Sequence, residues 1–478
     1  MRSFPLNPCL SIVFTAALSF PVVAQDMRPH YQPISADYGY RPNNEALQEA
    51  VDSQDRAAVR EHGWRLWAGI MQPLESDPTW PLWLSWRTTF DAFEAKDPPP
   101  VTPHRGLPPA HATAGATPLP VSAGQVPNVN TPSPKYPVPT YVIDTFPAAV
   151  TKGDDGYSIN DGLFFQSNGD IMIATESLSQ DGYDAIRANE LYLKDKLAAL
   201  QAAGENVDLP LSYVSTKHMY WPVRADGLTP FPVWQNNLPD WFSGYAGYEV
   251  WNTLVAIDPS GSQGKSDVLV DYLYGLETPE GAKIPPQKRH ARVVDLQNFY
   301  HHKVTQADWD MFTEADKAII TAASLWLYDE PFKVGDYLAT VAMHVVTKEI
   351  PSWSFQSVWW SPTPNHGKYA KDRPEDLKAE GPWDQYLLTD SYDFPVDAEG
   401  DLDIAVNPYI EGVIHPIATN CRNCHVRAGY PSSPSATPHT SYQNAACPGL
   451  LTMLTPDNAC FEGIALSDFA WIIPDRAK

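Results

Sequence analysis

Two patterns of hydrophobic and polar positions along the chain predict a mixture of helices and strands. Apolar residues at three- and four-residue steps predict an amphipathic helix over residues 181–203, with Gly204 directly after its last turn. A further helical region is expected over residues 44–71. Alternating or continuous apolar runs predict strands at 248–257, 267–274, 292–300 and 336–347, of which the last has the clearest pattern.

Two pairs of threonine and aspartate, each three residues apart, predict the starts of two further helices. Thr305 precedes Asp308 by three residues, and Thr313 precedes Asp316 in the same way. In this capping arrangement the Thr side chain and the acidic side chain each accept a backbone N–H of the first turn. Taken with the strands, these helices predict an α+β fold, with a mixed or antiparallel sheet, flanking helices and long Pro-rich loops.

A break in the apolar pattern divides the chain into regions. Residues 97–140 hold three consecutive prolines and almost no periodic apolar positions, which predicts a Pro-rich linker or surface strap. Before it, residues 25–96 are expected to form an N-terminal helical region, whose tryptophans between Trp80 and Trp86 are interpreted as packing residues. Residues 141–405 are expected to form the α+β core, followed by a C-terminal region at 406–478.

The first residues of the chain resemble an export signal. Residues 1–24 combine a basic start at Arg2, an apolar stretch at 9–18 and small residues ending at Ala24. This pattern predicts a secretory signal peptide cleaved near Ala24, and therefore a periplasmic or secreted protein. No later apolar stretch is long enough to cross a bilayer, so no membrane span is expected in the mature form.

Composition narrows the expected partners. The formal net charge is −24 over 478 residues, which argues against binding to nucleic acid or to anionic membranes. The chain also lacks the zinc-protease, nucleophile-elbow, Walker A and dinucleotide motifs. A small-molecule substrate or a small redox partner is the remaining expectation.

The strongest chemical signal is the pentapeptide that ends at His425. Cys421 and Cys424 are separated by two residues, and His425 follows at once. In this spacing two thiols can each add to one haem vinyl group, and the adjacent imidazole can bind the iron. The sequence therefore predicts one covalently attached haem c, with His425 as the proximal ligand.

The other cysteines fit an oxidising compartment. Cys9 lies in the predicted signal peptide and leaves with it. With Cys421 and Cys424 assigned to haem, Cys447 and Cys460 remain as a predicted disulfide pair. Closing a loop of this size contributes about 3 kcal/mol in the chain-entropy description.

A resemblance to a known family rests on one segment and on the position of the haem motif. The stretch from Met343 and His344 through Lys348, Ile350 and Pro351 to Trp353 resembles that of large exported mono-haem cytochrome c-like proteins. Their haem motif also lies near the C-terminus. The resemblance covers the C-terminal third best and implies the fold and the haem; most members of this family are uncharacterised.

Several residues are candidates for the side of the haem opposite His425. They are His344 on the clearest strand, Met453, and His415 just before the motif, with an open or water-bound iron as the alternative. We expect strand 336–347 to border the haem with His344 facing it, as ligand or as hydrogen-bond donor, and Trp353 and Phe355 to help wall the pocket. Two functional hypotheses follow: a haem-dependent oxidoreductase acting on a small substrate or peroxide, or an electron-transfer cytochrome serving a periplasmic partner.

Overall fold

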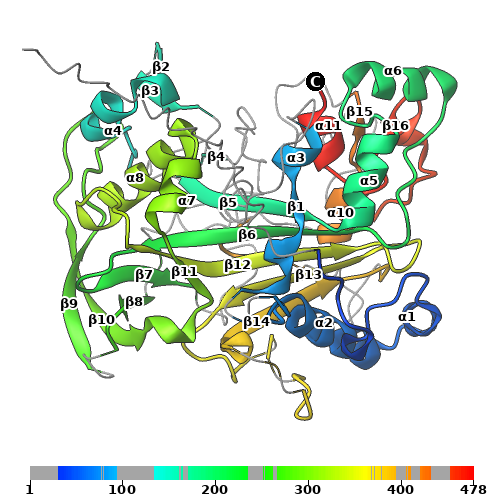
Figure 1. Cartoon of the computed structure of the whole chain (residues 1–478), viewed down its shortest axis with the longest axis horizontal. Helices are drawn as coiled ribbons and strands as arrows, with labels where there is room; N and C mark the ends of the chain where they lie inside the picture. The colour runs from blue at the N-terminus through cyan, green and yellow to red at the C-terminus, as the bar shows by residue number, and fades with distance from the viewer. Residues whose placement is uncertain are drawn as a thin grey trace, which may run out of the picture.

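The structure is a computed structural model of the chain (Figure 1). It describes residues 31–93 except 77 and 79; 134–234 except 155, 161, 162 and 165–170; 251–394 except 252, 262–265, 368, 371, 378 and 380; and 405, 407–410, 420–431 and 453–478. The predicted signal peptide, most of the predicted Pro-rich segment, His415 and Cys447 lie outside these residues.

The centre of the fold is a sheet of eight antiparallel strands, which with the flanking helices confirms the α+β class. Its main path runs β1–β5–β6–β12–β13–β14, with β4 paired to β5 and β11 paired to β12. The predicted strand 336–347 is the central β12, Tyr337–Thr347. The other strands are β1 Arg87–Thr88, β4 Leu163–Phe164, β5 Ile171–Leu178, β6 Val214–Val223, β11 His301–Lys303, β13 Ser354–Trp360 and β14 Tyr386–Ser391.

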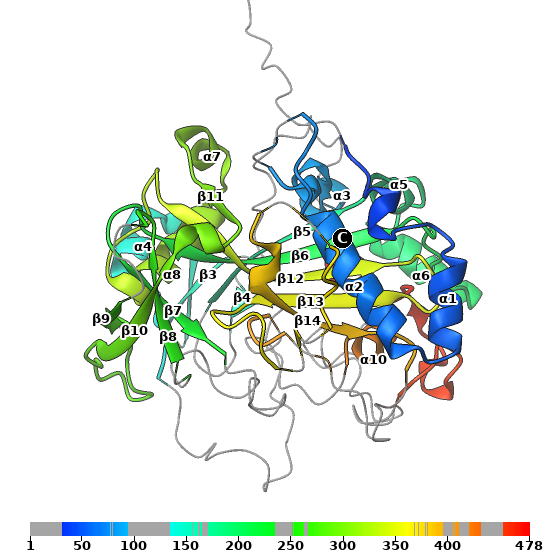
Figure 2. The ribbon, with the colours of Figure 1, turned by 90° about the horizontal axis from the view of Figure 1, so that it is seen from below.

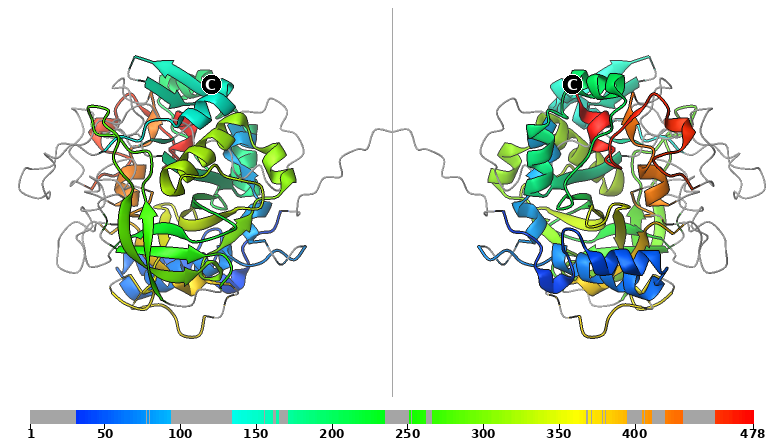
Figure 3. Two further views of the ribbon diagram at one scale, coloured as in Figure 1. Left: turned by 90° about the vertical axis from the view of Figure 1, so that its left-hand side faces the viewer. Right: turned by 90° about the vertical axis from the view of Figure 1, so that its right-hand side faces the viewer.

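The two faces of this sheet are covered by opposite ends of the chain (Figure 1). Helix α2, Arg56–Ile70, lies below the strands, where Gly63 comes close to the side chains of Gln356 and Leu388. The C-terminal helices α10, Cys421–His425, and α11, Ile472–Arg476, lie above them. Figure 3 shows the same separation of the N-terminal and C-terminal segments from the side.

A second, four-stranded sheet lies beside the first (Figure 2) and has the order β7–β8–β10–β9. Only the β8–β10 pair in it is parallel. Three predicted strands lie here, although the strand predicted at 292–300 begins and ends several residues earlier than expected. The bounds are β7 Thr229–Val233, β8 Thr253–Asp258, β9 Asp267–Tyr272 and β10 Gln287–Asp295.

Both predicted capping boxes are present. Thr305 and Asp308 start α7, Gln306–Met311, and Thr313 and Asp316 start α8, Glu314–Tyr328. In each case the side chain of one residue accepts the backbone N–H of the other. Helix α4, Thr140–Thr145, lies beside α8, whereas α3, Thr89–Phe93, lies beside β1 and α5 (Figure 1).

The single helix predicted over 181–203 is wrong, because the structure has two. Helix α5, Gln180–Ala188, ends before a turn in which Glu190 has a φ of 56°, and α6, Lys194–Ala203, begins after it. A left-handed residue interrupts the helical hydrogen bonds, although the apolar spacing continues across the break. Gly204 ends α6 in the left-handed conformation, as its position predicts. The region 44–71 is likewise divided into α1 Glu45–Asp52 and α2, with Asp55 capping the second helix.

The two largest hydrophobic clusters of the described residues hold these layers together. The larger one extends from Ile34 to Ile410 and includes Trp83 and Trp86, so the predicted packing role of these tryptophans is confirmed. The smaller one joins the C-terminal segment to α5, α6 and the ends of β12 and β13. Within the described residues, no helix has the length and apolar character needed to cross a bilayer.

Candidate functional site

The predicted haem-attachment residues form one short helix on the upper face of the central sheet. Asn420 caps α10 by accepting the backbone N–H of Asn423 at 2.8 Å. The helix lies against the ends of β13 and β14, where the backbone N–H of Arg422 donates to Ser391 Oγ at 3.2 Å. At about 3.6 residues per turn, Cys421, Cys424 and His425 project from one side of the helix, within an arc of about 100°.

The hydrogen bond made by His425 fixes its tautomer. Nδ1 lies 2.7 Å from the backbone carbonyl oxygen of Phe469. A carbonyl can only accept, so Nδ1 carries the proton and, in the neutral ring, Nε2 carries the lone pair. This is the arrangement that metal-binding imidazoles commonly have, with one nitrogen donating to protein and the other directed at the metal.

The two cysteines of α10 are in the chemical state that haem attachment requires. Neither Cys421 nor Cys424 takes part in a disulfide, and both are half-buried. Two thiols and an imidazole on one side of a helical turn fit the donor set of haem c. Cys460 is disulfide-bonded. Cys447 lies outside the described residues, so the Cys447–Cys460 pairing stays a prediction.

The aromatic residues expected near the haem take two different positions. The ring of Phe355 lies 5.0 Å from the ring of His425, centroid to centroid. Trp353 packs one layer further away, 6.4 Å from Phe355 and 5.9 Å from Phe469. Phe355 is therefore the direct neighbour of the imidazole, and Trp353 supports it from behind.

Strand register places His344 on the same face of the sheet as α10. Residues directly opposite in an antiparallel sheet point to the same face, and so do residues two apart on one strand. Val346 is opposite Phe355, and His344 is two positions before Val346 on β12, about 7 Å along the strand. His344 therefore faces the side on which Phe355 meets His425.

His344 belongs to a row of polar residues that crosses five strands, which we call the polar row. The register of the paired strands aligns Glu176, Lys217, His344, Ser357 and Thr389. All five side chains point to the face that carries α10. The sequence alone did not show this row, because its members come from strands up to about 200 residues apart.

Part of the polar row is accessible to solvent. From Leu338 to Thr347, every residue of β12 is buried except His344, and Lys217 and Glu176 are also partly exposed. Glu176 accepts from Arg476 of α11 and lies 3.9 Å from Lys217 Nζ. Burial raises the pKa of the nearby Asp475 to about 7. The positive charge of Arg476 lowers this pKa, and the negative charge of Glu176 raises it.

Met453 lies against α10 but on a different side of the helix. Its sulfur accepts from Asn420 Nδ2 at 3.4 Å, and the next backbone N–H donates to Asn423 Oδ1 at 3.0 Å. Asn423 points roughly 150° away from the middle of the side that carries the cysteines and His425. The third candidate, His415, lies outside the described residues.

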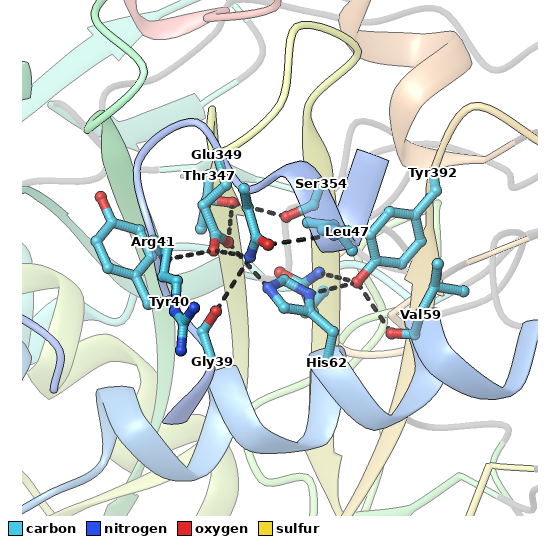
Figure 4. Close-up of polar contacts among 12 residues, drawn as sticks. Gly39, Tyr40, Arg41, Leu47, Val59, His62, Thr347, Glu349, Ser354 and Tyr392 are labelled. Carbon is cyan, nitrogen blue, oxygen red and sulfur yellow. Dashed lines mark hydrogen bonds and ion pairs between the residues drawn. The ribbon is translucent and has the colours of Figure 1, made fainter. Parts of the chain in front are cut away.

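A second polar cluster, centred on Glu349, lies on the lower face (Figure 4). His62 of α2 contacts both Glu349 Oε2, at 3.0 Å, and Tyr392 Oη, at 2.9 Å. Burial alone would raise the pKa of Glu349, but His62 and the donated hydrogen bonds bring it below its usual value. Glu349 is fully buried, and it also accepts from the backbone N–H of Arg41, Asn44 Nδ2 and Thr347 Oγ1.

The Glu349 cluster ties the N-terminal helices to the central sheet, whereas the preceding Lys348 binds the C-terminal segment. Sequence reasoning missed the His62–Glu349 contact, because 287 positions separate these residues. No local pattern signals such a pair.

No family model, curated protein or solved structure matches this chain. Among the residues that the structure describes, no group of three or more His, Cys, Asp or Glu side chains is arranged to hold a metal ion directly. The chemistry of α10 and of the polar row is therefore the basis for assigning a function.

Proposed function

We propose that this chain is an exported mono-haem c-type cytochrome with its haem attached at Cys421 and Cys424 and its proximal ligand at His425. The observation that carries the proposal is the state of α10: two thiols outside disulfides, and an imidazole whose Nδ1 donates to the Phe469 carbonyl. The imidazole Nε2 is then the nitrogen suited to bind iron.

We further propose that the protein acts as a haem-dependent oxidoreductase on a small substrate or peroxide. When bound, haem supplies one-electron redox chemistry and a coordination position for such a molecule. The polar row places imidazole, carboxylate and hydroxyl groups on the face that carries α10, and side chains of these kinds can act as general acids or bases in such a reaction. His344 is the row member on the central strand and the one that we assign to face the reacting molecule, as ligand or as hydrogen-bond donor.

One observation favours an alternative, an electron-transfer cytochrome serving a periplasmic partner. Met453 packs beside the start of α10 through its contact with Asn420. Methionine with histidine ligation raises the haem potential and suits an electron carrier. The position of Met453, away from the side of the helix that carries His425, makes this the second candidate.

The variant His344→Ala separates these functions. If His344 is a ligand, the low-spin absorption spectrum of the holoprotein should become high-spin. If it is a hydrogen-bond donor, the spin state should hold while turnover of peroxide falls by about 10²- to 10⁴-fold, the usual contribution of a positioned acid or base.

His301→Ala is the matched control. His301 lies on β11 of the same sheet, opposite Ala339 and well away from His344 along β12. The His301→Ala variant should leave the absorption spectrum and the turnover of peroxide unchanged. If His344→Ala behaves in the same way as this control, His344 has no role in the chemistry, and a methionine-to-iron charge-transfer band would then support the electron carrier.

A further inference from the structure

The loop that supplies the acceptor for His425 is held in place by one carboxylate. Asp468 precedes Phe469, whose carbonyl accepts from His425 Nδ1. Asp468 itself accepts from three donors: Lys348 Nζ at 2.7 Å, the backbone N–H of Leu209 at 2.8 Å and Trp353 Nε1 at 3.0 Å. The side chains of Asp468 and Lys348 are both largely buried, at 13% and 9% exposure.

The backbone at this point is strained. Asp468 has a φ of 52° and Phe469 a φ of 64°, and Trp353, which binds Asp468, has a φ of 63°. A left-handed conformation is uncommon for residues other than glycine, and particularly for bulky ones such as Phe and Trp. Such a strained conformation persists only where several surrounding contacts hold it in place, and it is found most often at functional sites. Here the contacts are those made by Asp468, and the carbonyl that the strained turn presents is the one that faces His425.

We propose that Lys348 and Trp353 are positioning residues for the proximal histidine, acting through Asp468. They hold the carboxylate, the carboxylate holds the left-handed turn, and the turn aims the Phe469 carbonyl at His425 Nδ1. The hydrogen bond that this nitrogen donates makes the imidazole a stronger electron donor through Nε2 and fixes the orientation of the ring. This inference rests on the proposed attachment of haem at α10.

Trp353→Phe tests the inference, because it removes the indole N–H while keeping an aromatic ring. Trp360→Phe is the matched control: Trp360 is equally buried on β13, and its Nε1 donates to the backbone carbonyl of Asn298 at 2.9 Å. Both variants lose one part-buried indole hydrogen bond, but only Trp353 contacts Asp468. The measurements are the haem midpoint potential of the holoprotein and, in the His344→Ala background that removes the candidate second ligand, the iron–histidine stretching frequency of the reduced protein by resonance Raman spectroscopy.

Trp353→Phe should lower the stretching frequency and make the potential more positive, because the imidazole becomes a weaker donor. Trp360→Phe should leave both values at those of the unmodified protein. Equal values in all three proteins would overturn the inference and would leave Trp353 with a packing role alone.

Asp468→Asn provides a second variant in case Trp353→Phe does not fold. Asparagine tolerates the left-handed backbone better than most residues, so the turn can persist while the ion pair to Lys348 is lost. It should shift the two haem measurements in the same direction as Trp353→Phe. A holoprotein that shows no shift refutes this inference alone, whereas a chain that attaches no haem refutes the proposed function together with it.

Discussion

Removing the carboxylate of Glu349 should destabilise the protein by about 3–5 kcal/mol, the range for deleting one partner of a buried pair. Glu349 is fully buried and accepts hydrogen bonds from four residues, Arg41, Asn44, His62 and Thr347. A buried donor left without an acceptor costs about 1–3 kcal/mol. Glu349→Ala removes an acceptor from four donors. The total stays below the sum of four such costs, because the Arg41 N–H is only part-buried and Asn44 Nδ2 and Thr347 Oγ1 keep their contacts with the Gly39 carbonyl and Ser354 Oγ.

Urea unfolding at pH 7, followed by far-ultraviolet circular dichroism, measures this loss. Glu314→Ala is the control, because Glu314 is a 54% exposed helix residue that pairs with Lys317 at 3.0 Å. An exposed ion pair of this kind contributes about 0–1 kcal/mol. The difference between the two variants therefore isolates the effect of the buried cluster.

The same prediction has a defined pH dependence. The pKa of Glu349 is lower in the folded protein than its usual value, so its stabilising effect is present above that usual value and is lost as the pH falls through the folded-state pKa. The gap between the unmodified protein and Glu349→Ala should therefore narrow in acid. A loss below about 1 kcal/mol at pH 7, equal to that of the surface control, would refute the assignment of Glu349 as the contact that ties the N-terminal helices to the sheet.

Two further predictions concern Asp475 and the pair Cys447 and Cys460. Because the pKa of Asp475 is raised to about 7, its contribution to stability is present below the ordinary aspartate pKa and is lost as the pH rises toward 7. Asp475→Asn should therefore raise the melting temperature at pH 8 but not at pH 4. An equal effect at both pH values would contradict the raised pKa. Non-reducing peptide mapping should recover Cys447 and Cys460 in one linked pair, and recovery of both as thiols from periplasmic protein would rule the pairing out.

The sequence predicted the elements whose signals are local. The capping boxes at Thr305 and Thr313, the central strand β12 and the glycine that ends α6 each depend on residues within a few positions of one another. The break between α5 and α6 escaped prediction because the apolar spacing continues through Glu190, whose left-handed conformation has no strong sequence signature.

In the candidate site, too, local signals were predicted from the sequence and long-range contacts were not. The haem-attachment residues are adjacent in sequence and were recognised from their spacing, whereas the polar row depends on strand register that only the folded sheet establishes. The role that we assign to Asp468 was equally hidden, because its donors Lys348 and Leu209 lie 120 and 259 positions away. No alternation or motif connects such distant residues.

Covalent attachment of haem is the claim on which the account depends, and one measurement tests it directly. The chain is expressed in a host that attaches c-type haem in its periplasm, denatured, extracted with acid acetone and analysed by intact mass. We expect the mass of the chain plus one haem, its loss in the double variant Cys421→Ala with Cys424→Ala, and its retention in Cys460→Ala. A wild-type chain that releases all its haem on extraction would contradict the account.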